Sequence, residues 1–533
     1  MAAAEAARPA LELLGRAANC QIRLGKRQYR SMAAKDTVVL VLAAGKGTRL
    51  RSDVAKVLHR AGGRPLVEHV IRAAAAIKPT EIIAVVGHQA EAVEAAVGPL
   101  GANAVLQNPQ RGTGHAVQVA RRAIRRSAKF LLVVPGDAPL LRAETLAALV
   151  NFHRAGNAAA TVLSAELADP SGYGRVIRKE DGSVAAIVED SAVSPEQRQI
   201  TEINSSIYCF TLAKLWPALA AVRPNNVHKE LYLTDAIAVL NEHRERVLAM
   251  VAADANESLG CNTRESLADV DRIFRQRKAK ELMESGVTIY LPETVTIDAD
   301  VSVGRDSVIE SGVQLLGATK IGERCTIGSA SILTNMRVDD DAIIEAHCIA
   351  LDSRLGEKAH IGPFTRLRPG ADLRDGARVG NFVEVKKSVL HEGAKAMHLT
   401  YLGDTTVGAK SNIGAGTITC NYDGTHKFPT VIGKRAFVGS DSTLVAPVRI
   451  GDGAYVAAGS TITDNVPADA LAIARGKQAN KVGWASKRRA ALAREADSKS
   501  KSRPTRKRGG AKSRRRRAAA RRGKSARGRS RRK

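Results

Sequence analysis

The feature that most constrains the fold is a six-residue rhythm in the second half of the chain. Apolar residues recur every six positions from Val303 to Leu333, continue after one-residue slips to Ile361, and return from Ile432 to Ile462, often followed by Gly. Repeats of this length are typical of a parallel β-helix, in which each coil uses three short strands and stacks its apolar residues inward. The sequence therefore predicts a left-handed parallel β-helix of hexapeptide repeats over residues 287–483.

The rhythm is interrupted between Arg366 and Phe428, and the interruption is rich in residues that can bind an anion. Insertions in a solenoid project from one face, often the binding face. A single His is more often structural than catalytic, but its combination with several cations and a Tyr favours function. The candidates are Arg366, Arg368, Lys386, Lys387, His398, Tyr401, Asn412, Asn421, Tyr422 and Lys427.

The first half begins with a buried-strand pattern over residues 37–43 that runs into a glycine loop. Gly45 and Gly47 end the apolar run, and Arg49 and Lys56 follow. Glycines at the carboxyl end of a strand let backbone N–H groups approach a phosphate, and nearby cations neutralise its charge. A tight turn needs no ligand, but the added Arg and Lys favour a phosphate site.

Strand and helix patterns then alternate, which predicts an α/β fold with a mostly parallel sheet. We expect strands over 81–86, 104–107 and 130–134, with helices between them. The last of these strands ends in Pro135-Gly136-Asp137. A carboxylate at this edge either ligates a metal ion in the ligand crevice or caps a turn, and the position alone does not decide between the two.

Several motifs of this half together resemble a known family. They are Leu42 to Arg49 with Lys56, Gln107, Gly112-Thr113, Gly136-Asp137, Gly172 to Arg175, Ile187 to Glu189 and Glu202 to Asn204. This set resembles the sugar-1-phosphate nucleotidyltransferases, and within them the uridyltransferase half of the bifunctional GlmU family. The sequence departs from the family pattern at Pro135, where Tyr is common, and at Ser206, where Gly is common.

The resemblance implies that this half binds UTP, N-acetylglucosamine 1-phosphate and Mg²⁺. Transfer of a nucleotidyl group gathers negative charge, so alignment and neutralisation by Mg²⁺, Lys and Arg suffice without a protein nucleophile. By resemblance, Leu42, Ala43, Ala44, Gly45 and Arg49 meet the phosphates and base of UTP, Lys56 neutralises phosphate, and Gln107, Gly112 and Thr113 read uracil. Gly174, Glu189 and Asn204 hold the acetylated sugar, Gly136 is a further substrate-binding residue, and Asp137 and Asn262 both bind substrate and ligate Mg²⁺.

The second half resembles the acetyltransferase part of the same family. The matching motifs are Arg368 to Gly370, Gly380 to Lys387, His398 to Asp404 and Asn412 to Gly424. By resemblance, Arg368, Lys386, Tyr401 and Asn412 hold glucosamine 1-phosphate, His398 is the general base, and Ala415, Asn421, Tyr422, Ser440, Ala458 and Arg475 bind acetyl-CoA. A base is required because a protonated amine has no lone pair with which to attack a thioester.

The implied protein is a bifunctional enzyme. It would acetylate glucosamine 1-phosphate with acetyl-CoA and then couple the product to UTP, releasing pyrophosphate and UDP-N-acetylglucosamine for peptidoglycan and lipopolysaccharide. Family members are homotrimers, with acetyl-CoA between coils of neighbouring subunits. Two alternatives stay open: a nucleotidyltransferase with a non-catalytic β-helix, and a polyanion-binding protein led by its basic tail.

The remaining segments complete the expected organisation. Residues 32–263 form the uridyltransferase domain, and 264–286 form a linker helix. Residues 484–533 form a disordered tail, because Lys499 to Lys533 contain 19 Lys and Arg and no acid. Such a tail can contact nucleic acid or an anionic surface non-specifically. The extension 1–31 resembles no secretory signal; either it is a transit peptide or Met32 is the true start, which we prefer.

The cysteines and the hydropathy indicate the compartment. Six scattered Cys residues without a CxxC pair fit neither a zinc site nor a disulfide framework. The apolar run from Val38 to Ala44 is too short to span a bilayer. We therefore expect a protein of the reducing cytoplasm without a membrane span.

Overall fold

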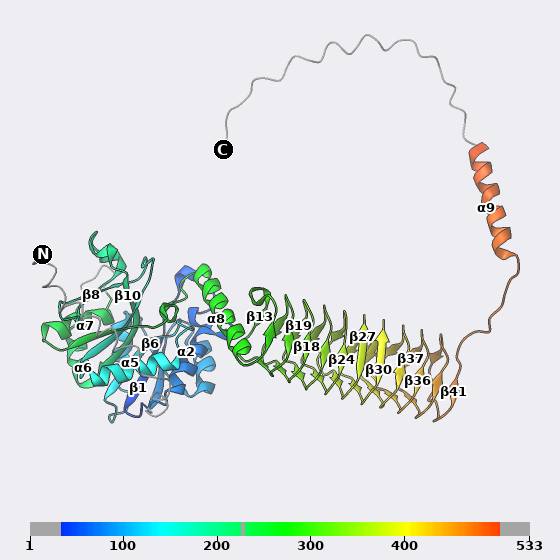
Figure 1. Ribbon diagram of the computed structural model, residues 1–533, viewed down its shortest axis with the longest axis horizontal. Coiled ribbons are helices and arrows are strands. Elements are labelled where there is room, and N and C mark those ends of the chain that lie inside the picture. Colours follow the sequence, from blue (N-terminus) through cyan, green and yellow to red (C-terminus); the bar gives the residue numbers. More distant parts are fainter. Residues whose placement is uncertain (1–33, 225–229, 502–533) are drawn as a thin grey trace, which may run out of the picture. The chain divides into compact units, whose positions relative to one another are not determined.

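The computed structural model describes residues 34–224 and 230–501 (Figure 1). The expected extension 1–31 and the greater part of the expected tail lie outside the described residues. The chain divides into two compact units after Ala474. This division does not fall at any of the domain limits expected from the sequence, which stay predictions.

The first half of unit 1 is built on a nine-stranded sheet with the order β11-β7-β10-β6-β1-β4-β5, to which β8 and β9 are added at β10. Its strands are β1 (Thr37–Ala43), β4 (Glu81–Val86), β5 (Ala102–Leu106), β6 (Phe130–Pro135), β7 (Ala160–Glu166), β8 (Arg175–Arg178), β9 (Val184–Val188), β10 (Glu202–Thr211) and β11 (Val247–Val251). Strand β1 pairs in parallel with β4 and β6, whereas β10 is antiparallel to β6 and β7. The predicted α/β fold is confirmed.

Helices cover both faces of this sheet. They are α2 (Leu66–Ala76), α3 (Ala90–Val97), α4 (Thr113–Ala120), α5 (Ala143–Ala155), α6 (Leu212–Ala221) and α7 (Leu233–Glu242). Successive side chains of a strand point to opposite faces, so Val38 and Leu40 pack with α4, α6 and α7, and Val39 and Val41 pack with α2, α3 and α5. Burial on both faces explains why β1 is an unbroken apolar run.

Helix α8 (Arg264–Glu284) follows this sheet, and it begins with a capping box between Thr263 and Ser266. Val270 packs in a cluster with residues of the first half, and Leu282 packs into the core of the coils that follow. The hairpin of β2 (Arg60–Ala61) and β3 (Arg64–Pro65) also joins the two halves. Ala299 N, in the first coil of the second half, donates to Gly62 O in the hairpin turn at 2.9 Å. Side chains of one helix therefore pack in the hydrophobic cores of both halves.

The second half of unit 1 is a parallel β-helix whose strands form three sheets, as the six-residue rhythm predicted (Figure 1). The first sheet holds β12 (Thr288–Ile289), β15 (Val308–Ile309), β18 (Thr326–Ile327), β21 (Ile343–Ile344), β24 (His360–Ile361), β27 (Arg378–Asn381), β30 (Lys395–His398), β33 (Asn412–Ile413), β36 (Phe437–Val438), β39 (Tyr455–Val456) and β41 (Leu471–Ala472). We call it the His398 sheet.

The next sheet along each coil, here called the Lys386 sheet, holds β13 (Thr296–Ile297), β16 (Gln314–Leu316), β19 (Ile332–Thr334), β22 (Ile349–Leu351), β25 (Arg366–Leu367), β28 (Glu384–Lys386), β31 (Tyr401–Gly403), β34 (Ile418–Cys420), β37 (Thr443–Val445) and β40 (Thr461–Ile462). The third sheet holds β14 (Ser302–Val303), β17 (Lys320–Ile321), β20 (Arg337–Val338), β23 (Arg354–Leu355), β26 (Asp372–Leu373), β29 (Val389–Leu390), β32 (Thr405–Val407), β35 (Thr430–Ile432) and β38 (Val448–Ile450).

The expected interruption of the rhythm after Arg366 is wrong for most of its length. The coils continue, with Leu367, Leu373, Val379 and Val385 buried in the same core as the earlier repeats. The six-residue spacing itself continues from Ile361 to Val385, one-residue slips follow only at Leu390 and Val407, and Thr419 then occupies an inward-facing position. Only the loop between β34 and β35 is an insertion.

The second unit contains helix α9 (Trp484–Lys501). It falls within the segment 484–533, for which the sequence predicted disorder, and so that prediction is wrong for these residues. Ala, Leu, Arg, Lys and Glu make up most of the first part of α9, and all are strong helix formers. Within residues 34–224 and 230–501, no helix is both long and apolar enough to span a bilayer.

Candidate functional site

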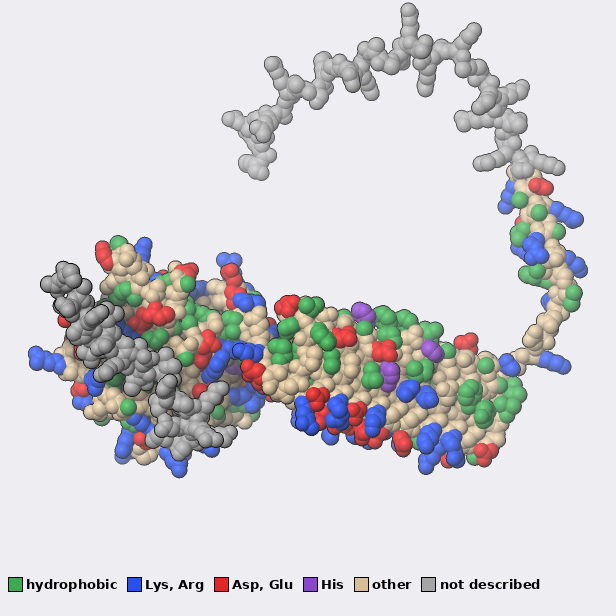
Figure 2. Space-filling model, viewed as in Figure 1, with side chains coloured by type: hydrophobic (Ala, Val, Ile, Leu, Met, Phe, Trp, Pro, Cys, Tyr) green, Lys and Arg blue, Asp and Glu red, His purple; other side chains and the backbone are tan. Residues whose placement is uncertain are grey.

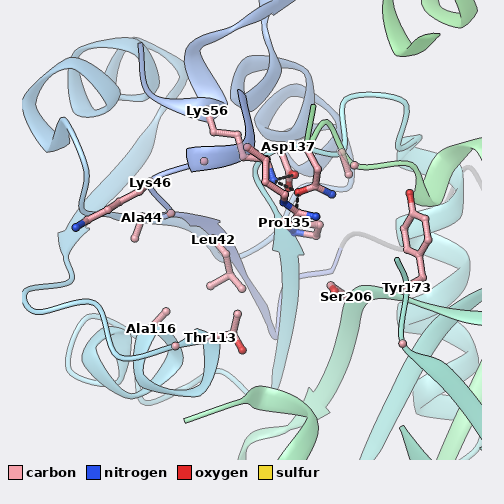
Figure 3. A pocket seen from close by; sticks show the side chains of 18 of the residues that line it. Leu42, Ala44, Lys46, Lys56, Thr113, Ala116, Pro135, Asp137, Tyr173 and Ser206 are labelled. Atoms are coloured by element: carbon pink, nitrogen blue, oxygen red, sulfur yellow. Dashed lines mark hydrogen bonds and ion pairs between the residues drawn. The ribbon is translucent and has the colours of Figure 1, made fainter. Parts of the chain in front are cut away.

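A cavity of about 720 Å³ opens at the carboxyl ends of β1 and β6 (Figure 3). In parallel sheets this edge is where ligands bind. The cavity is lined by most residues that the sequence predicted for the first half: Leu42, Ala44, Gly45, Arg49, Lys56, Gln107, Gly112, Thr113, Asp137, Gly174, Glu189, Asn204 and Asn262. Residues from all seven sequence motifs of the first half, together with Asn262, thus meet in one place.

Two predicted residues, Ala43 and Gly136, do not line the cavity. Ala43 is 2% exposed and points into the core beneath the sheet. Gly136 N donates to Leu42 O at 2.9 Å, and a Cβ on Gly136 would stand 3.0 Å from the same oxygen. Their positions serve the close packing of β1 against β6, because small residues let the two strand ends approach.

Four polar side chains converge at one end of the cavity. Lys56 forms an ion pair with Asp137, and its Nζ donates to Asn262 Oδ1 at 2.7 Å. Arg49 donates to the same Oδ1 at 2.9 Å. Gly47 makes this arrangement possible, because its φ of 61° suits Gly and a Cβ there would stand 2.6 Å from Lys56 Cβ.

The donor set of this cluster fits a hard divalent cation. A carboxylate of Asp137 and an amide oxygen of Asn262 already face one positive charge, the ammonium of Lys56. No group of three or more His, Cys, Asp or Glu suited to a metal exists among the described residues. A cation here would therefore take few protein ligands and complete its shell with phosphates and water, which is the preference of Mg²⁺.

The far side of the cavity is formed by β10 and by the strands beside it. Asn204 N donates to Gly174 O at 2.8 Å, and Asn204 Nδ2 donates to the Tyr208 hydroxyl at 2.8 Å. Thr234 donates to Glu189 at 3.1 Å, and partial burial raises the pKa of the Glu189 carboxyl. Fixed amide and carboxyl groups of this kind suit the hydroxyl and amide groups of a sugar.

The two departures from the family pattern also lie in the cavity wall (Figure 3). Pro135 is the last residue of β6. Ser206 has φ of 62°, and the pairing of β10 with β7 shifts register between Asn204 and Ile207. A positive φ favours glycine, so the structure explains why Gly is common here and why Ser carries a conformational cost.

In the β-helix the predicted base His398 ends strand β30 and is exposed. His398 pairs in register with Asn381 of the previous coil, and His398 Nδ1 lies 2.8 Å from Asn381 Oδ1. An amide oxygen accepts a hydrogen bond from Nδ1–H, which leaves Nε2 as the basic nitrogen of a neutral imidazole. The pair therefore has the geometry of an oriented base.

The predicted cations lie on the Lys386 sheet. Lys386 pairs in register with Gly403 of the next coil, and Arg368 donates to Glu384 at 2.9 Å. A hydrogen bond to Lys427 and the charge of that side chain lower the pKa of the Lys386 ammonium. The positive charges of Lys386 and Lys427 repel each other, and an anion bound by both would relieve this repulsion. The pair therefore indicates an anion-binding site.

The other residues predicted for the acetyl-transfer site are spread around the coils. Tyr401 lies on the Lys386 sheet, whereas Asn412 lies on the His398 sheet. The residues predicted for acetyl-CoA divide in the same way: Ala415, Ser440 and Ala458 follow strands of the His398 sheet, Asn421 and Tyr422 lie in the loop before β35, and Arg475 belongs to the second unit. The structure of one chain thus does not gather this set.

The sequence-based prediction missed several residues of both sites. Gln110 lines the cavity and donates to Ala44 O at 3.0 Å, and Tyr173 also lines it. Asn381 and Glu384 contact the predicted base and cation. All four lie within or beside the motifs, so a search of the neighbours of each predicted residue would have found them.

Comparisons with known proteins agree with the two halves. The family model of the MobA-like NTP transferase domain matches residues 39–233. The models of the bacterial transferase hexapeptide (six repeats) and of the hexapeptide repeat of succinyl-transferase match residues 429–464 and 318–348. These matches fall on the sheet domain and on the β-helix respectively.

Individual relatives are matched over nearly their full length as well. The bifunctional protein GlmU of Koribacter versatilis (strain Ellin345) is 49% identical over 456 residues, which are 85% of this chain and 97% of that protein. That of Solibacter usitatus (strain Ellin6076) is 51% identical over 452 residues, again 85% and 97%. The chain therefore belongs to the GlmU family and is a bifunctional enzyme, a nucleotidyltransferase and an acetyltransferase.

Proposed function

We propose that the cavity at the ends of β1 and β6 binds UTP and N-acetylglucosamine 1-phosphate and joins them with Mg²⁺ held by Asp137 and Asn262. The single observation that carries this is the convergence of Asp137, Asn262, Lys56 and Arg49 at one end of the cavity. When bound, Mg²⁺ neutralises phosphate charge. The ammonium of Lys56 stands where it neutralises further charge as the sugar phosphate attacks the α-phosphate.

Within the cavity, the assignment of substrates follows the chemistry of the walls. The glycine loop from Leu42 to Gly45 offers backbone N–H groups to phosphate, with Arg49 beside it. Gln107, Gly112 and Thr113 form a polar edge for the base, and Gly174, Glu189 and Asn204 form the sugar side. In this assignment the α-phosphate of UTP would lie between the base side and the sugar side of the cavity.

For the second reaction, we propose that His398 Nε2 accepts a proton from the amine of glucosamine 1-phosphate. Asn381 holds the ring through Nδ1. Arg368 and Lys386 bind the phosphate, whose charge favours the close approach of Lys427 to Lys386, and Tyr401 and Asn412 complete the sugar contacts. The freed amine attacks the acetyl carbonyl of acetyl-CoA, and the thiolate leaves as coenzyme A. The orientation of His398 argues against a non-catalytic β-helix.

We propose further that the acetyl-transfer site is complete only in a homotrimer. Each coil turns a corner between its strand in the His398 sheet and its strand in the Lys386 sheet. In successive coils this corner carries Phe364, Phe382 and Leu399, whose side chains form an apolar row and are 47%, 56% and 63% exposed. The rings of Phe364 and Phe382 stack at 5.3 Å. Figure 2 shows a band of charged side chains along one edge of the β-helix and hydrophobic side chains gathered elsewhere on it. An apolar row of this kind supports contact between copies.

Such contact would bring together the residues that one chain keeps apart. Lys386 of one subunit and Asn412 of another lie on different sheets, so a neighbouring β-helix at the shared corner lets both face one substrate. The acetyl-CoA residues Ala415, Ser440, Ala458, Asn421 and Tyr422 would line the same boundary.

One coupled assay tests the whole assignment. Purified enzyme receives glucosamine 1-phosphate, acetyl-CoA, UTP and Mg²⁺, and UDP-N-acetylglucosamine is measured by chromatography. We expect product only when all four are present, and expect N-acetylglucosamine 1-phosphate to replace the first two. Product formation without acetyl-CoA from glucosamine 1-phosphate would contradict the proposed order of the reactions.

We place the enzyme in the cytoplasm, where UTP and acetyl-CoA are available. For the basic tail we propose non-specific contact with nucleic acid or another anionic surface, because Lys499 to Lys533 carry no acid. Removal of the residues after Asp497 should weaken retention on heparin and leave both reactions within a few-fold. Equal retention would assign any polyanion affinity to the folded part.

A further inference from the structure

Gln107 follows strand β5 and is held in one orientation by two neighbours. Its side chain is 4% exposed and lines the cavity. Gln107 Nε2 donates to Gly112 O at 3.0 Å and lies 3.1 Å from His115 Nδ1. His115 stands on the first turn of α4 and is itself not part of the cavity wall.

The two contacts use both hydrogens of the amide. A primary amide has two N–H donors and one carbonyl acceptor. With one hydrogen on Gly112 O and the other on His115 Nδ1, only Oε1 remains for a ligand. Among the described residues no hydrogen bond to Gln107 Oε1 is found, so this acceptor is available to whatever enters the cavity.

The imidazole of His115 can accept this hydrogen only when Nδ1 carries none. Partial burial lowers the pKa of His115, and the charge of Arg111 acts in the same direction. A neutral ring protonated on Nε2 therefore prevails at neutral pH and offers a lone pair at Nδ1. A flipped amide would instead set Oε1 against two acceptors, the carbonyl of Gly112 and Nδ1 of His115.

A fixed acceptor distinguishes two pyrimidines of the same shape. Uracil carries a hydrogen on N3, whereas N3 of cytosine is itself an acceptor. Oε1 of Gln107 therefore forms a hydrogen bond with uracil and meets a repelling lone pair in cytosine. A site built to pair one polar group rejects an analogue that cannot pair.

We propose that His115 is a specificity-determining positioning residue, which locks the Gln107 amide so that the enzyme accepts UTP and rejects CTP. The proposal rests on the assignment of Gln107 to the base. The backbone around the pair is held independently, because Gly114 N donates to Leu231 O at 2.8 Å and Gln110 donates to Ala44 O. The loss of Nδ1 therefore frees the amide more than it moves the loop.

The test compares two substitutions at the same position. In His115→Phe no acceptor replaces Nδ1, whereas in His115→Asn an amide oxygen can take its place. We measure kcat/KM for UTP and for CTP with N-acetylglucosamine 1-phosphate. We expect the UTP to CTP ratio to fall about tenfold in His115→Phe, as for the loss of one hydrogen bond, and to stay near wild type in His115→Asn.

A double substitution shows whether His115 acts through Gln107. Gln107→Ala should lower the ratio by itself, and His115→Phe added to Gln107→Ala should lower it no further. An unchanged ratio in a folded His115→Phe enzyme, or a further loss in the double variant, would overturn the proposal. Absence of UTP turnover in the wild type would instead refute the proposed function, and a normal ratio in Gln107→Ala would refute the base assignment. Thermal unfolding of each variant, followed by circular dichroism, serves as the folding control.

Discussion

The two halves of the chain assemble their candidate sites in different ways. In the sheet domain, Asp137, Lys56 and Asn262 come from distant parts of the sequence and touch one another within one chain. In the β-helix, Lys386 and Asn412 are closer in sequence but lie on different sheets. In our proposal the first site is complete in a single subunit, whereas the second needs a neighbour.

The difference follows from the geometry of each fold. A doubly wound sheet brings the carboxyl ends of its strands to one edge, so loops from separate motifs enclose a cavity. A β-helix stacks equivalent positions in rows, so residues one coil apart lie side by side and residues on different sheets face different directions. A solenoid therefore provides rows and corners, and in the proposed trimer a second copy supplies the opposite wall.

The largest expected effect is on His398. His398→Ala should lower acetyl transfer by about 10² to 10⁴ fold, the usual contribution of a positioned base. Uridyl transfer from N-acetylglucosamine 1-phosphate should persist, because no residue of the cavity comes from the β-helix. Both rates are measured separately, and trimer content is checked by light scattering. A trimeric variant with near-normal acetyl transfer would remove the proposed base.

The converse substitution is Asp137→Ala. It removes the carboxylate that faces Lys56, and we expect uridyl transfer to fall by about 10³ fold, since metal-based charge neutralisation contributes several kcal/mol. Acetyl transfer should stay near wild type. Calorimetric titration with Mn²⁺ should show weaker binding. Equal losses of both activities in a folded variant would contradict two separate sites.

Much of this architecture could be predicted from the sequence. The strand over residues 37–43 and the strand over 81–86 were predicted with the limits that the structure has. The six-residue rhythm predicted the three-sheet β-helix, because one apolar residue per strand must face inward. Most residues that line the cavity could be predicted, because they lie within sequence motifs that resemble those of a known family.

The rest depended on contacts that no single motif contains. The coils from Leu367 to Val385 keep the six-residue spacing and could have been predicted from it, whereas one-residue slips at Leu390 and Val407 break a strict count beyond them. The hydrogen bonds of Asn381 with His398 and of Gln107 with His115 join side chains whose approach requires the folded chain. Helix α9 was not predicted, because the basic composition of the tail indicates disorder although its first residues are strong helix formers.

A smaller effect is expected at Asn381. Asn381→Ala should lower acetyl transfer about tenfold, because one hydrogen bond to the ring is lost while the base remains. Asn381→Asp retains an acceptor and should recover most of the rate. Identical rates for Ala and Asp would show that Asn381 does not orient His398.

The smallest expected effect is at Ser206. Because its φ is 62°, Ser206→Gly should relieve a left-handed backbone penalty of about 1–2 kcal/mol at an entropic cost of about 0.5–1 kcal/mol, so it should stabilise the sheet domain by about 0.5–1 kcal/mol. Thermal unfolding followed by circular dichroism should show a modest increase in Tm, and uridyl transfer should stay within a few-fold. A lower Tm would mean that the Ser206 side chain contributes more than its backbone conformation costs.

The most direct test of the contrast between the two sites is subunit complementation. Lys386→Ala and Asn412→Ala chains carry different tags, are co-expressed, and are purified as mixed oligomers by both tags. If each acetyl-transfer site takes Lys386 from one subunit and Asn412 from another, every mixed trimer has one intact site in three, so mixed trimers should regain about a third of the wild-type acetyl-transfer rate.

The matched control mixes Asp137→Ala with Lys56→Ala in the same way. Because Asp137 and Lys56 form an ion pair within one chain, mixed oligomers should show no more uridyl transfer than the single variants. This result together with recovered acetyl transfer is what the account predicts. Acetyl transfer that stays at the level of the single variants in verified mixed trimers, or uridyl transfer that recovers, would contradict it.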